Sequence, residues 1–227
     1  GVMKAVRERG FEGEVHWNEW GRSWFPTDPL KETALEAAFI AKTMAEVSHE
    51  ADYFGYWCLS DIYNQAGLQS SEFQGHYGML SLHGLRKPSW FAHQMLERLG
   101  TEQISVDGGD PLTGSIATRG PNGHHVLVYA YPESPDAAPT TETISVELPE
   151  ETSDLTLYRL GIAENNIIAQ WNAMGSPPYP TPAQISELRV RNTLTPAPVT
   201  EIQIQNATAT FTIERPGVAL LEMGKAT

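Results

Sequence analysis

A glutamate placed between tryptophans carries the clearest chemistry in this sequence. Glu19 lies near the end of residues 13–21, GEVHWNEWG, between Trp17 and Trp20. Aromatic rings stack on the faces of pyranose sugars, and a carboxylate in a dry pocket can attack or stabilise an oxocarbenium-like centre. The pattern therefore predicts a sugar-cleaving site. Such chemistry also requires a second carboxyl group.

An isolated glutamate is more often an ion-paired surface residue or a helix cap than a catalytic group. Trp17, Trp20, Trp24 and Trp57 shift the balance, because four of the six tryptophans lie within the first 57 residues. Tryptophans are large apolar residues, and several at strand ends favour a ligand-binding surface.

Other reactive residues give weaker signals. His16 is better interpreted as a supporting histidine than as a base, and Cys58 as a small apolar residue inside a strand. Asp61, His76 and His83 lack the spacing of metal ligands. Neither a glycine-rich phosphate loop nor a Gly-x-Ser-x-Gly elbow occurs in the sequence. We therefore expect no metal and no cofactor.

The elements that must position Glu19 read as βα units. Residues 14–20 predict a short strand, and Asp28 with Pro29 predicts the start of a helix whose alanines recur at helical spacing. Residues 53–59 are nearly all apolar, which predicts a strand buried on both faces. A polar loop at 60–77 precedes a second helix that opens at Lys87 and Pro88. Two strands cannot close a sheet of this kind, so we expect further strands from outside this sequence, or a second copy of the chain, to complete it.

The sequence changes character near residue 101. Short β-prone runs separated by Gly, Pro, Asn and Asp predict an antiparallel sandwich. These runs are 115–118, 126–131, 143–148, 155–160, 201–204, 209–213 and 218–222. Residues 165–174 predict a helix, and the proline-rich residues 175–182 predict an extended segment that wraps the surface. We expect two domains, residues 1–101 and residues 102–227.

Composition excludes several partners. The net charge is −13, and Lys and Arg are not clustered, which argues against nucleic acid or an anionic membrane as the main partner. The single cysteine excludes an intrachain disulfide. No stretch resembles a signal peptide or a membrane span, so a cytoplasmic location is favoured.

Several blocks in order resemble glycoside hydrolase family 39, and its β-xylosidase branch most closely. The blocks are VHWNEW at 15–20, DPLKETA at 28–34, YWCLSD at 56–61, YGMLSLHG at 77–84 and KPSWFA at 87–92. The likeness continues through residues 166–185, which are similar to a helical excursion of the family's β-domain. It spans nearly the whole chain and weakens at 107–151.

The resemblance implies a fold and a set of roles. The fold class is the C-terminal part of a (β/α)8 barrel, residues 1–101, followed by an antiparallel β-sandwich. Glu19 matches the nucleophile of a retaining glycosidase, at the end of the seventh barrel strand, and Trp57 on the eighth strand matches the aromatic floor of the sugar subsite. The expected substrate-binding residues are Trp57, Asn64, Gln65, His83 and Trp20.

The resemblance also implies what the chain does not supply. The family's acid/base glutamate follows an asparagine on the fourth strand, usually as Asn-Glu-Pro, and that tripeptide is absent from this sequence. The chain would carry half of a catalytic pair and would be inactive alone. The alternative is an inactive fragment that binds carbohydrate or acts as a scaffold.

One departure concerns the substrate. Where xylosidases of the family carry two consecutive glutamates after the eighth strand, this chain has Asn64 and Gln65. Amides still form hydrogen bonds, but the charge is lost. A different pentose or a uronic acid therefore fits as well as xylose.

Overall fold

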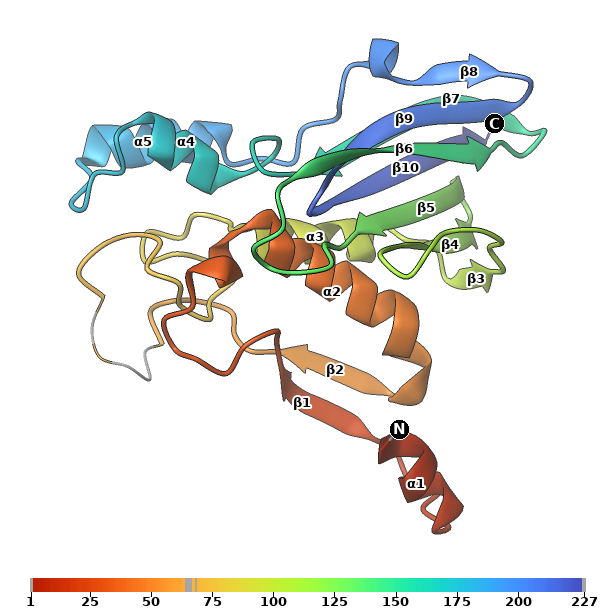
Figure 1. Ribbon diagram of the computed structural model, residues 1–227, viewed down its shortest axis with the longest axis horizontal. Coiled ribbons are helices and arrows are strands. Elements are labelled where there is room, and N and C mark those ends of the chain that lie inside the picture. Colours follow the sequence, from red (N-terminus) through yellow and green to blue (C-terminus); the bar gives the residue numbers. More distant parts are fainter. Residues whose placement is uncertain (1, 64–66, 68, 226–227) are drawn as a thin grey trace.

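The computed structural model describes residues 2–63, 67 and 69–225. Its first part is an α/β segment, shown in red to yellow in Figure 1. The elements are α1 (Val2–Glu8), β1 (His16–Trp20), η1 (Pro29–Glu32), α2 (Ala34–Val47), η2 (Ser48–Glu50), β2 (Tyr53–Tyr56) and α3 (Pro88–Glu97).

Two N-caps follow one another here, one for a short turn and one for the first long helix. The side chain of Thr33 accepts a hydrogen bond from the Leu35 amide and begins α2. Asp28, which the sequence marks as the helix cap, instead caps the short 3-10 turn η1. The turn precedes the helix because Thr33 adopts an extended backbone at its end and can act as a new N-cap.

The strands β1 and β2 form a two-stranded parallel sheet. Trp17 pairs with Phe54 and Trp20 with Tyr56, with an irregularity in register between these pairs. The expected strand 53–59 is shorter, and it is not buried on both faces. Tyr53 is 53% exposed and Leu59 is 58% exposed, since only β1 pairs with β2 in this sheet.

Beyond residue 101 the chain forms two antiparallel sheets (Figure 1). The five-stranded sheet has the order β3-β4-β5-β10-β7 and the three-stranded sheet the order β6-β9-β8. The strands are β3 (Glu102–Ile104), β4 (Thr113–Gly120), β5 (Gly123–Ala130), β6 (Thr140–Glu147), β7 (Thr152–Leu160), β8 (Gln203–Gln205), β9 (Thr208–Arg215) and β10 (Gly217–Lys225). The pattern predicted seven of these strands in approximate position and missed β3, which is only three residues long.

Two helices and a turn interrupt the sheets between β7 and β8: α4 (Ile167–Ala173), α5 (Pro182–Arg191) and η3 (Val199–Glu201). The proline-rich segment ends in a helix, because Pro182 suits the first helical turn and Thr181 forms a capping box with Gln184.

Three hydrophobic clusters hold these layers together. The first joins α2 and α3 to one face of the five-stranded sheet, and Ile40, Phe91 and Leu220 are fully buried in it. The second lies between the two sheets around Phe211 and Leu221. The third packs the loop after β2 against α4 and α5. The five-stranded sheet is thus covered on both faces.

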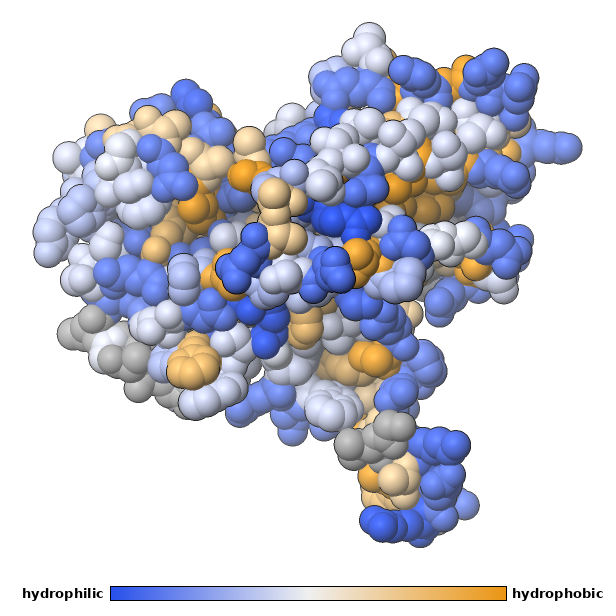
Figure 2. Space-filling model, viewed as in Figure 1, coloured by the Kyte–Doolittle hydropathy of each residue, from blue (hydrophilic) through white to orange (hydrophobic). Residues whose placement is uncertain are grey.

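An apolar seam lies between the two sheets. Figure 2 shows hydrophilic residues over most of this face, with apolar side chains visible along that seam. Val126, Val128, Ile144 and Val146 line a groove of about 820 Å³ there. Among the described helices, none is both long enough and apolar enough to cross a membrane.

Candidate functional site

The register irregularity in the parallel pair falls at the carboxyl end of β1, where Glu19 lies. Glu19 and Asn18 occupy the interval between the paired residues Trp17 and Trp20, and Glu19 is exposed. An irregularity of this kind bends a strand and redirects its side chains, and such features are common beside active sites. Glu19 therefore lies exposed at this irregularity, one residue before the end of β1.

Trp20 packs toward α2. Its ring packs edge-on against Tyr56 at 5.4 Å and lies 6.0 Å from the ring of Phe39 on α2. These contacts anchor β1 to α2 and join the Trp20 ring to the edge of the first hydrophobic cluster. The structure places Trp20 in the core beneath the strand, and its predicted contact with a substrate stays a prediction.

Trp57 lies beside the end of β1. Its backbone amide donates to the carbonyl of Trp20 over 3.1 Å, which brings the residue after Glu19 and the residue after β2 together. The half-buried Trp57 ring meets the exposed ring of Tyr63 edge-on at 5.4 Å, and the Trp57–Cys58 peptide bond is cis. Two aromatic rings thus meet just after β2, and the backbone of one is bonded to the residue that follows Glu19.

The remaining predicted residues divide between two places. Asn64 and Gln65 lie outside the described residues. His83 lies in a turn, where its backbone amide donates to Glu72 over 3.0 Å and its ring Nδ1 also contacts that carboxylate. The His83 carbonyl accepts a hydrogen bond of 2.9 Å from Arg189 on α5. The described contacts connect His83 to the helical excursion, and none of them joins it to Glu19 or Trp57.

A buried network of ion pairs and hydrogen bonds, centred on Glu36, joins the segment after β1 and the end of β2 to α2. Arg22 forms ion pairs with Asp28 at 2.5 Å and with the fully buried Glu36 at 3.1 Å. Tyr56 donates to the other Glu36 oxygen over 2.8 Å. Burial raises the pKa of Glu36, and burial beside Glu36 raises the pKa of Tyr56 well above its usual value.

A second buried ionic cluster fixes the loop after β2. The fully buried Lys87 contacts Glu32 at 2.7 Å and Asp61 at 2.5 Å. Asp61 in turn accepts a hydrogen bond of 2.7 Å from the Gly78 amide. A charged residue is rarely buried unless it is paired. The only signal in the sequence was a lysine directly before a helix that opens with proline.

An exposed aromatic pair lies in the loop that follows β1. Trp24 is 78% exposed and stacks on Phe25 with ring centroids 4.4 Å apart. Lys31 and Tyr77 hold this pair through its backbone: the Lys31 ammonium donates to the Phe25 carbonyl, and the Tyr77 hydroxyl donates to the Trp24 carbonyl. The tryptophan content of this region signalled Trp24, whereas Lys31 and Tyr77 stood only within the blocks of the family resemblance, with no role assigned to them.

No set of three or more His, Cys, Asp or Glu side chains gathers into a metal site in the described part of the chain. The site therefore offers one exposed carboxylate, aromatic rings at two neighbouring strand ends, and buried ion pairs that hold the surrounding loops. A carboxylate beside aromatic rings at strand carboxyl ends is typical of carbohydrate-active enzymes.

Comparison with known proteins identifies the group. The chain belongs to the glycosyl hydrolases family 39, whose family model matches residues 2–207. It is 32% identical over 191 residues to a beta-xylosidase of Caldicellulosiruptor saccharolyticus, covering 82% of this chain and 39% of that protein. It is 28% identical over 190 residues to a beta-xylosidase of Geobacillus stearothermophilus, covering 82% of this chain and 37% of the relative.

Solved structures share the fold. A monomeric beta-xylosidase from Caulobacter crescentus CB15 superposes with a TM-score of 0.84 at 22% identity, covering 100% of this chain and 48% of that chain. A family 39 enzyme from Xanthomonas axonopodis pv. citri gives a TM-score of 0.80 at 20% identity, covering 99% of this chain and 47% of that one. This chain thus spans about two-fifths of the length of the curated relatives it matches.

Proposed function

We propose that this chain supplies the nucleophile of a retaining glycosidase of the β-xylosidase type. Glu19 attacks the anomeric carbon, and a carboxylic acid about 5 Å away protonates the leaving group. That acid comes from outside these 227 residues. In this proposal β1 and β2 are the last two strands of a (β/α)8 barrel, and residues 102–227 form its accessory sandwich.

One contact supports this proposal above the others. The hydrogen bond from the Trp57 amide to the Trp20 carbonyl, 3.1 Å long, joins Trp57 to the residue that follows Glu19. A sugar ring stacked on Trp57 then presents its anomeric carbon toward the neighbouring strand. The family match and the beta-xylosidase relatives support the same reaction class.

The nucleophile is tested by covalent labelling of the enzyme with a complete barrel. A 2-fluoro-xyloside with a good leaving group traps the glycosyl-enzyme, and peptide mapping locates the adduct. We expect the adduct on Glu19, and a loss of roughly 10³-fold or more in kcat for Glu19→Gln, since removal of a nucleophile disables the whole reaction path. Glu14→Gln is the matched control, because Glu14 is also exposed and, among the described residues, its side chain pairs with His16 alone.

The outcomes separate the alternatives. An adduct on a different residue contradicts the role of Glu19. Full absence of turnover and labelling, in a protein whose sandwich is folded, favours a non-catalytic carbohydrate-binding or scaffolding role instead.

The sugar that is cleaved depends on Asn64 and Gln65. Two amides in place of two carboxylates remove negative charge, so a sugar that bears a carboxylate is repelled less. We expect the double variant Asn64→Glu/Gln65→Glu to raise the ratio of kcat/KM for an aryl β-xyloside over the matching uronide by about tenfold, the equivalent of about 1.4 kcal/mol. An unchanged ratio removes these two residues from the specificity of the site.

A further inference from the structure

A row of polar side chains crosses the helix-covered face of the five-stranded sheet. Under α2 and α3 this face is apolar, with Ile116, Leu127, Leu220 and Tyr158 in register on four adjacent strands. Two residues further along the same strands the row becomes Thr118, His125, Glu222 and Thr156. Because side chains two apart share a face, this polar row continues the apolar one.

The helix that covers the apolar row ends before it reaches the polar one. α3 stops at Glu97, and the next residue, Arg98, donates to both oxygens of Glu222 over 2.8 and 3.0 Å. Arg98 also donates to the Tyr158 hydroxyl over 3.0 Å. The helix end is therefore fixed to the sheet, while the surface beyond it stays open.

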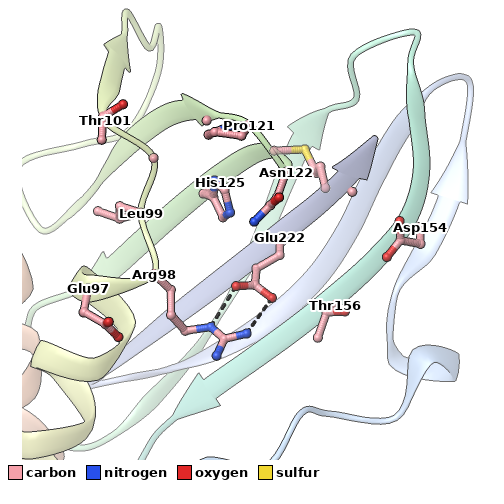
Figure 3. Close-up of a pocket in the computed structure, with 14 residues that line it drawn as sticks. Glu97, Arg98, Leu99, Thr101, Pro121, Asn122, His125, Asp154, Thr156 and Glu222 are labelled. Carbon is pink, nitrogen blue, oxygen red and sulfur yellow. Dashed lines mark hydrogen bonds and ion pairs between the residues drawn. The ribbon is translucent and has the colours of Figure 1, made fainter. Parts of the chain in front are cut away.

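Glycines occupy the next row of the sheet. Gly120, Gly123 and Gly224 are paired across three strands, and Asp154 follows on the fourth. Gly120 and Gly224 line a hollow of about 540 Å³ at the end of α3 (Figure 3). This volume lies within the range of sites for small ligands, about 300–1,000 Å³.

His125 lines the hollow and carries a buried ring nitrogen, Nδ1, without a hydrogen-bond partner among the described residues. Buried polar atoms almost always have a partner, which is the reason to look for a ligand here. Figure 3 shows His125, Asn122 and Glu222 around the same hollow, with Thr156 and Asp154 on the strand opposite.

The charges of the lining select against anions. The Arg98 charge is balanced by Glu222, and Glu97 and Asp154 add two carboxylates. Burial lowers the pKa of His125, so its ring is neutral at pH 7. Leu99 and Pro121 provide small apolar walls. A lining with many hydrogen-bonding groups and no excess positive charge suits a ligand with many hydroxyl groups and no charge.

We propose that this hollow binds a neutral saccharide, one or two sugar rings in length, at a site separate from Glu19. The first residue before α3, Lys87, belongs to the buried cluster with Glu32 and Asp61, whereas Arg98 at the other end borders the hollow. Ten helical residues span about 15 Å, so the helix separates the hollow from that cluster. The inference does not depend on the catalytic role of Glu19.

The test is a titration of the full chain with xylobiose, followed by NMR. We expect saturable shifts of the His125 ring nitrogens and of the Asn122 side-chain amide. Thr156→Phe fills the hollow and should weaken binding at least tenfold, whereas Thr143→Phe, the same change on the exposed face of β6, should not. Asn122→Ala is a second variant, at an exposed turn where loss of fold is not expected.

Two further arms make the result decisive. Glucuronate and inorganic phosphate should bind at least fivefold more weakly than xylobiose, and tighter binding of either anion overturns the proposal. Glu19→Gln should leave the His125 shifts intact, which separates this site from the proposed catalytic one. Shifts confined to Trp57 and its neighbours, or unchanged affinity in Thr156→Phe and Asn122→Ala, also overturn it.

Discussion

A single buried residue, Lys31, holds the backbone of the loop that follows β1. Its side chain is 4% exposed, and its ammonium lies 3.7 Å from the centre of the Tyr77 ring and donates to the Phe25 carbonyl. Burial lowers the pKa of Lys31 from 10.5 to about 8, against the attraction of Asp28 and Glu36. The stacked Trp24 and Phe25 rings are exposed to solvent, yet their backbone is held by a residue that the solvent barely reaches.

This lowered pKa predicts a dependence of stability on pH. Between pH 8 and pH 10.5 the unfolded chain keeps the Lys31 proton while the folded chain releases it, so the free energy of unfolding rises with pH in that window. Below pH 8 both states are protonated and the cost of burying the charge is fully present. We expect the wild type to gain stability relative to Lys31→Met from pH 8 to pH 10, measured by urea unfolding. A difference that stays constant contradicts the lowered pKa.

At the scale of elements, α5 fixes the turn that carries His83. Asn192, at the end of α5, accepts from the Arg86 amide over 2.5 Å and donates to the Arg86 carbonyl over 2.9 Å. Asn192 is 6% exposed, so both bonds are shielded from water. Together with the bond from Arg189 to His83, these contacts make the helical excursion a support for the loop after β2.

Removal of this support has a measurable cost. Asn192→Ala leaves both polar groups of Arg86 without a partner and should lower the free energy of unfolding by about 1–3 kcal/mol. Asn192→Asp keeps the acceptor but loses the donor. Its free energy of unfolding should lie between those of Asn192→Ala and the wild type. Hydrogen exchange of the Arg86 amide should accelerate in Asn192→Ala and much less in Asn192→Asp, which keeps the acceptor of that amide.

The control for this pair is Asn172→Ala on α4. Asn172 is exposed, and its side chain accepts from Ser176 alone among the described contacts. We expect a change within about 0.5 kcal/mol. If Asn172→Ala loses as much stability as Asn192→Ala, the effect comes from the helices themselves and not from the two hydrogen bonds between Asn192 and Arg86.

At the scale of the whole molecule, one hydrophobic cluster joins the α/β segment to the five-stranded sheet. Ala37, Ile40 and Phe91 from the helices pack with Leu127 and Leu220 from the strands, and all five are buried. The boundary proposed near residue 101 therefore divides the sequence but not the core. Two segments that share a core are expected to unfold together.

Leu220→Ala tests this shared core. The substitution should lower the free energy of unfolding by about 2–5 kcal/mol, since it leaves a cavity between α2 and the sheet. Amide exchange in α2 and in β9 should accelerate by the same factor if the segments unfold as one unit. Ile204→Ala on the exposed β8 is the control, with an expected change under about 0.5 kcal/mol. Acceleration in β9 alone shows that the two segments unfold separately.

The sequence by itself determined the local elements and the place of the carboxylate. Helical spacing of alanines located α2, alternating β-prone runs located most strands of the sandwich, and the tryptophans marked Glu19. Each of these features depends on residues within a few positions of one another, where backbone preferences and side-chain periodicity act.

Only the tertiary structure decided how distant residues meet. It turned Trp20 toward α2, tied Arg86 to Asn192 across 106 residues, and joined Arg98 to Glu222 across 124 residues. It also set three glycines side by side at the end of α3. The physical reason is that a hydrogen bond or a hollow between elements exists only after the strands have found their register, and register is fixed by the core as a whole.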